Sequence, residues 1–86
     1  MIIKLNQNQF DYLNCNLPEE KMLILKQNQI SKDNRFVIIE IDEHVADVIR
    51  DWANEELQKK GFDKNYELTH EGNILEDLVD MFYIKS

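Results

Sequence analysis

The clearest structural pattern in the chain lies in residues 43–60. Apolar residues recur there every three or four positions, which is the repeat of an α-helix with one buried face. Asp42 can accept hydrogen bonds from the first free backbone N–H groups, and Gly61 suits the left-handed residue that ends a helix. The sequence therefore predicts an amphipathic helix from Glu43 to Lys60, with Trp52 facing the core.

Two runs rich in β-branched residues precede this helix. The runs are Lys21–Ile30 and Arg35–Asp42, and the turn formers Ser31-Lys32-Asp33-Asn34 separate them. This arrangement predicts an antiparallel hairpin at the centre of a sheet. Because both runs contain consecutive apolar residues instead of an alternating pattern, we expect helices or another subunit to cover both faces of the sheet.

The two ends of the chain supply the remaining elements. Ile2–Leu5 is short and apolar, as expected of a strand, and Asn6 can cap a helix that ends at Pro18. Thr69 can cap a last helix with an apolar stripe. The predicted fold class is α+β, in the order β-α-β-β-α-α, with a three-stranded sheet whose central hairpin packs against helices. Since 86 residues enclose one core, we expect a single α/β domain over residues 1–86.

Apolar run lengths and cysteine content point to a cytoplasmic protein. The longest apolar runs hold four residues each, whereas about 20 are needed to cross a bilayer. The first residues lack the pattern of a secretory signal, so we expect no membrane association. Cys15 is the only cysteine, which excludes an internal disulfide and fits a reducing compartment. The abundance of Asn, Ile and Lys is typical of hosts with AT-rich genomes and predicts a bacterial or phage source.

Charge is distributed unevenly along the chain. Residues 1–39 carry five basic and four acidic side chains, whereas residues 40–86 carry five basic and thirteen acidic ones. Such a surface repels phosphate backbones, so we expect no nucleic-acid binding and favour a basic protein partner. Asp47, Asp51 and Glu55 repeat every four residues on one helix face and are the candidate partner-binding residues. Solvation of that face is the alternative interpretation.

The sequence predicts no catalytic residue, cofactor or metal ligand. His44 and His70 lack a second histidine or cysteine at helical spacing, and the chain contains no glycine-rich phosphate loop, nucleophile elbow or Cys-x-x-Cys pair. Glu76, Asp77 and Asp80 crowd the last predicted helix. Paired carboxylates can hold a divalent cation or transfer protons, although such charges also simply solvate a helix.

One stretch of the chain has a familiar pattern. Gly61-Phe62-Asp63-Lys64-Asn65-Tyr66-Glu67-Leu68-Thr69, followed by Glu71-Gly72-Asn73-Ile74-Leu75-Glu76-Asp77-Leu78-Val79-Asp80, resembles the C-terminal part of small uncharacterised bacterial proteins. The resemblance implies no activity, cofactor or partner.

The hypothesis that follows is a non-enzymatic protein–protein interaction module with a regulatory or accessory role. One alternative is a small carboxylate-dependent cation-binding protein or enzyme. The other is a stand-alone structural homodimer, because a three-stranded sheet that is apolar on both faces has few helices to cover it.

Overall fold

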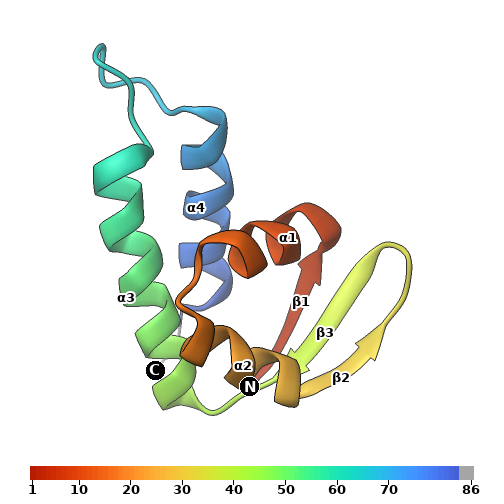
Figure 1. Ribbon diagram of the computed structural model, residues 1–86. Coiled ribbons are helices and arrows are strands. Elements are labelled where there is room, and N and C mark those ends of the chain that lie inside the picture. Colours follow the sequence, from red (N-terminus) through yellow and green to blue (C-terminus); the bar gives the residue numbers. More distant parts are fainter. Residues whose placement is uncertain (84–86) are drawn as a thin grey trace. The chain divides into compact units, whose positions relative to one another are not determined.

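The computed structural model describes residues 1–83 and has an α+β fold, as predicted. Within these residues the elements are β1 (Ile2–Asn6), α1 (Gln7–Asn16), α2 (Glu19–Gln27), β2 (Gln29–Lys32), β3 (Phe36–Glu40), α3 (Glu43–Lys60) and α4 (His70–Met81) (Figure 1). The predicted order of elements is preserved, and α2 is an additional helix between α1 and β2. No helix among the described residues is both long and apolar enough to cross a membrane.

The chain divides into two compact units, Met1–Glu43 and His44–Ser86. The first unit contains the sheet with α1 and α2, and the second contains α3, α4 and the loop that joins them. That residues 1–86 form a single domain stays a prediction.

The three strands form one antiparallel sheet in the order β1-β3-β2. β3 therefore lies at the centre, whereas β2, the other strand of the hairpin, lies at an edge and contains a bulge between Gln29 and Ser31. Directly opposed residues of an antiparallel pair project from the same face. One face thus carries a fully buried apolar set, and α1, which packs against β1 and β3, covers it. The buried residues of this face are Ile3, Leu5, Val37 and Ile39.

The expectation that helices cover both sheet faces is wrong for the described residues, whereas coverage by another subunit stays a prediction. On the face opposite α1, the side chain of Ile2 is 67% exposed, and Phe36 and Ile38 are only half-buried. The consecutive apolar residues in β3 therefore do not reflect two faces that are packed by the described residues of this chain. One face of the sheet therefore carries apolar residues that are exposed or only half-buried.

The predicted strand Lys21–Ile30 is also wrong, because Glu19–Gln27 forms α2 and only Gln29–Lys32 belongs to the sheet. The carbonyl oxygen of Pro18 accepts hydrogen bonds from the first turn of this helix. Acidic residues in that first turn and a lysine in the last turn complement the helix dipole. Met22 and Leu25, one helical turn apart, supply the buried side of α2.

The remaining helix boundaries follow the predictions closely. α3 spans Glu43–Lys60, and the Thr69 hydroxyl oxygen caps α4 by accepting a hydrogen bond from the Gly72 N–H at 2.9 Å. Trp52, expected in the core, is only half-buried, because it lies to one side of the three residues that form the buried stripe of α3. These are Ala46, Ile49 and Ala53.

Candidate protein-interaction surface

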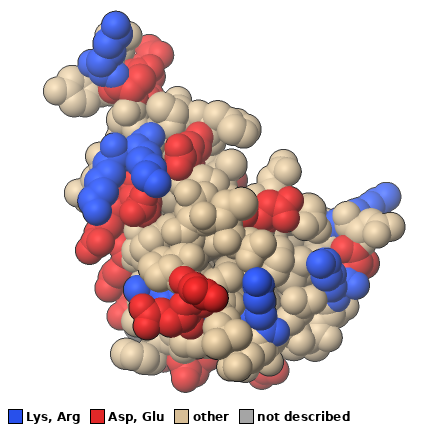
Figure 2. Space-filling model, in the orientation of Figure 1, with Lys and Arg blue, Asp and Glu red and all other residues tan. Residues whose placement is uncertain are grey.

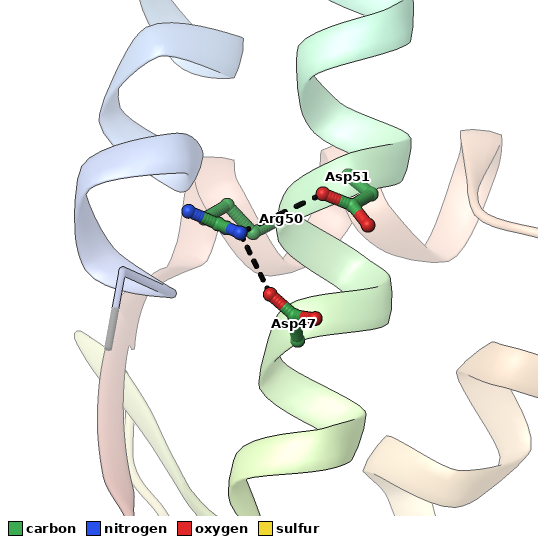
Figure 3. Close-up of polar contacts among 3 residues, drawn as sticks. All are labelled: Asp47, Arg50 and Asp51. Carbon is green, nitrogen blue, oxygen red and sulfur yellow. Dashed lines mark hydrogen bonds and ion pairs between the residues drawn. The ribbon is translucent and has the colours of Figure 1, made fainter. Parts of the chain in front are cut away.

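The predicted acidic row of α3 is partly neutralised by a basic residue within the same helix. Arg50 lies between Asp47 and Asp51, and its Nη2 atom is 2.7 Å from the Asp47 carboxylate and 3.7 Å from that of Asp51 (Figure 3). Glu55 is exposed and makes no ion pair among the described residues. The structure thus places all three acids on α3, but two of them share one guanidinium group.

Arg50 also reaches beyond its own helix. Its guanidinium carbon lies 5.7 Å from the centre of the Tyr83 ring, which follows α4. A cation over an aromatic face is attracted by the ring quadrupole. Arg50 therefore links the acidic row to the end of α4 within the second unit, and Asp47 and Asp51 help to orient it.

The second predicted cluster does not form a cation site in this structure. Glu76, Asp77 and Asp80 are exposed on α4. No group of three or more His, Cys, Asp or Glu side chains within residues 1–83 is arranged to hold a metal ion. His44 and His70 are exposed in the first turns of their helices, and Cys15 is exposed on α1.

The loop between α3 and α4 holds a surface that the sequence did not predict. Phe62 and Leu68 face each other as an isolated antiparallel bridge. Asp63 organises the turn between them. Its N–H donates to the Glu67 carbonyl at 2.9 Å, its carbonyl accepts from the Tyr66 N–H at 3.0 Å, and its carboxylate accepts from the Asn65 N–H at 2.8 Å. These hydrogen bonds stabilise the turn.

The base of the loop is closed by a second set of contacts. The Thr69 N–H donates to the Gly61 carbonyl oxygen at 2.8 Å, and the Thr69 hydroxyl group lies within 3.2 Å of the same oxygen. Gly72 also passes close to Gly61, since a Cβ atom at Gly72 would collide with the Gly61 carbonyl oxygen. The end of α3 and the start of α4 are thereby held in direct backbone contact.

The closed loop projects large apolar side chains into solvent. Tyr66 is 87% exposed, and Phe62 and Leu68 are 44% and 38% exposed. We call these three residues the hairpin tip. Tyr66 also adopts a φ of 63°, a left-handed conformation that costs a bulky residue about 1–3 kcal/mol. The turn formers in this stretch could have indicated a turn, but no sequence signal shows that the three apolar residues stay exposed.

A shallow hollow of about 180 Å³ lies between α1 and α2 in the first unit. This volume is smaller than the roughly 300–1,000 Å³ of typical small-molecule sites. Leu23, which contributes to its wall, is 53% exposed. The lining residues are Asn14, Leu17, Glu19, Met22, Leu23 and Lys26.

Comparisons of the chain with protein-family models, with curated proteins and with solved structures gave no match. The function proposed for the protein therefore rests on its own residues and their geometry.

Proposed function

We propose that the protein is a non-enzymatic interaction module, with a regulatory or accessory role in a bacterium or phage, which binds a basic protein partner through its second unit. The observation that carries this proposal is Tyr66, whose side chain is 87% exposed on a backbone with a φ of 63°. Backbone strain of this kind persists only where the surroundings impose it, and it concentrates at functional sites.

The chemistry of the hairpin tip suits a protein partner. Tyrosine is enriched among the residues that dominate binding energy, because it buries a large amphipathic surface with few rotatable bonds. The hydrogen bonds of Asp63 hold Tyr66 in place before a partner arrives, and this reduces the entropy cost of association. Phe62 and Leu68 extend the apolar area around it.

The charge of the second unit supports a basic partner. Asp63 and Glu67 lie within the loop, and Asp47, Asp51 and Glu55 lie along α3. Figure 2 shows acidic side chains interspersed with basic ones along the α3 side of the molecule. A negative field accelerates encounter with a positive protein surface and opposes binding of nucleic acid. We place this interaction in the cytoplasm, where the exposed Cys15 thiol stays reduced.

Affinity capture from the native host tests the hairpin tip. We expect Tyr66→Asn to lower recovery of a basic partner by about tenfold, because asparagine tolerates the left-handed conformation and only the aromatic contact is lost. Leu23→Asn is the matched control, since it removes an exposed apolar side chain from the first unit. Equal recovery of the same partner by the parent and Tyr66→Asn would contradict the proposal.

A second experiment tests the acidic row. Replacement of Asp47, Asp51 and Glu55 by lysine should slow association with that partner, and the loss should be largest at low salt because ions screen exposed charges. Circular dichroism should show unchanged helix content. An association rate that is unaffected at low ionic strength would remove these three residues from the binding surface.

Self-association is a second candidate function. The observation that favours it is the uncovered face of the sheet, where Ile2 is 67% exposed and Phe36 and Ile38 are half-buried. A sheet face with apolar residues gains free energy when a second layer covers it.

A further inference from the structure

The strand register defines the composition of the uncovered sheet face. Ile2 is opposed to Glu40, Lys4 to Ile38 and Asn6 to Phe36 across β1 and β3, and Ser31 of β2 lies on the other side of Ile38. We call this set the open sheet face. Each apolar residue of this face is directly opposed to a polar or charged one, and Ile2 and Ile38 are diagonal neighbours on adjacent strands.

The charges of this face are arranged so that two copies complement each other. Lys4 and Glu40 lie on adjacent strands, two residues apart along the strand direction. The Lys4 ammonium nitrogen lies 4.0 Å from the centre of the Phe36 ring. Neither Lys4 nor Glu40 forms an ion pair among the described residues. The face therefore offers one cation, one carboxylate and an apolar patch, with no net charge.

We infer that the open sheet face is a homodimer interface, on which a second copy of this chain packs through the same face. The inference rests on the self-association proposed above. A symmetric dimer requires a self-complementary patch. Lys4 and Glu40 lie diagonally on adjacent strands, so a two-fold axis that lies between the two sheets and runs obliquely to the strands places Lys4 of each copy opposite Glu40 of the other. Ile2 and Ile38 of one copy then lie next to the same residues of the other copy, beside the two ion pairs.

The size of the face sets the strength of this dimer. Three strands of about five residues cover an area of roughly 14 by 17 Å, from the strand spacing and the rise per residue. This footprint is well below the 800 Å² or so that each partner buries in a standard interface. We therefore expect a dimer that dissociates at micromolar concentrations.

Sedimentation equilibrium of the full chain tests both the association and the face. Between about 1 µM and about 500 µM, the mean mass should rise from 10.3 kDa toward that of a dimer. Lys4→Glu and Glu40→Lys should each weaken dimerisation by about tenfold, because each places like charges opposite each other. The double variant with both reversals should recover the parent constant within about threefold. Lys26→Glu, an exposed reversal on α2, is the matched control.

Different outcomes contradict different parts of the inference. A monomer at about 500 µM would overturn self-association itself. A dimer that neither single reversal weakens would overturn the open sheet face and assign the contact to another surface. Circular dichroism checks that each variant is folded. If a reversal prevents folding, Ile2→Thr keeps a strand-forming residue and should still weaken the dimer, and an unchanged dissociation constant would again exclude this face.

Discussion

Gly72 lies where the first turn of α4 touches the end of α3. A Cβ atom there would collide with the Gly61 carbonyl oxygen, a backbone atom that cannot move alone. Alanine favours a helix by up to about 1 kcal/mol over glycine, but the collision costs more. We expect Gly72→Ala to destabilise the protein by about 2–3 kcal/mol in urea unfolding. The control is Asn73→Ala, an exposed neighbour that should change stability by less than about 0.5 kcal/mol. Equal stability of Gly72→Ala and the parent would show that this contact yields without cost.

Asp33 gives the β2–β3 turn a dependence on pH. The N–H groups of Arg35 and then Phe36 donate to its carboxylate and lower its pKa. Because the pKa is lower in the folded than in the unfolded protein, the contribution to stability is present above about pH 4. It is lost as the pH falls through the folded pKa. A carboxyl carbon NMR titration should show Asp33 titrating below its value in an unfolded peptide, and Asp33→Asn should flatten the acid dependence of stability. Identical Asp33 titration midpoints in protein and peptide would contradict this.

Capping residues were predictable from sequence, whereas the conformation of Tyr66 was not. Asn6 and Thr69 cap α1 and α4 as predicted, since each needs only its own side chain and the following backbone N–H groups. Tyr66 adopts its left-handed conformation against its own preference. The cause is the set of hydrogen bonds around Asp63, whose joint geometry cannot be derived from residue types.

Two leucines of α2 distinguish a helix from the strand that the sequence predicted. In a strand, Leu23 and Leu25 would share one face, whereas in a helix they point to different sides. The structure buries Leu25 completely and leaves Leu23 53% exposed. We expect Leu25→Ala to destabilise by about 2–4 kcal/mol and Leu23→Ala by less than about 1 kcal/mol. Similar losses in chemical denaturation would favour the strand.

The error at residues 21–30 has a physical origin. A short apolar run such as Met22–Leu25 fits a buried strand or a short helix equally well by periodicity alone. The helix is favoured by Pro18 before it and by charges that match its dipole. For α3, in contrast, the predicted bounds Glu43–Lys60 are confirmed. The expected left-handed conformation of Gly61 is wrong, because no glycine in the described residues has a positive φ; glycine instead avoids a collision between a Cβ atom and Leu57.

The candidate site was predictable only in part, because helical spacing shows which residues share a helix face but not which contacts their side chains make. Helical spacing placed Asp47, Asp51 and Glu55 on one helix and predicted their mutual proximity. The same spacing allows an i, i+3 pair between Asp47 and Arg50, which the sequence prediction did not consider. The additional contact with Asp51 depends on the rotamer of the long arginine side chain. The exposure of Tyr66 in the hairpin tip was not predicted. Sequence patterns favour the core for large apolar side chains and do not show when a loop holds such a side chain away from the core.

At the scale of the whole molecule, the two compact units can unfold either together in one transition or separately. Each unit, Met1–Glu43 and His44–Ser86, is close to the roughly 40 residues below which a chain seldom folds without disulfides, metals or oligomerisation. Cys15 is the only cysteine, so no internal disulfide supports either unit. Neither unit is large enough to be expected to fold alone, and we therefore predict a single cooperative unfolding transition for the chain.

Two probes in different units measure this directly. Trp52, the only tryptophan, reports the second unit by fluorescence, and the backbone NMR signals of Val37 report the first. In urea the two probes should give the same midpoint. Leu25→Ala, in the first unit, should shift the Trp52 transition as far as that of Val37, and Gly72→Ala, in the second, should shift both equally. A Trp52 midpoint that Leu25→Ala leaves unchanged would mean that the units unfold independently, and the predicted single domain over residues 1–86 would then be wrong.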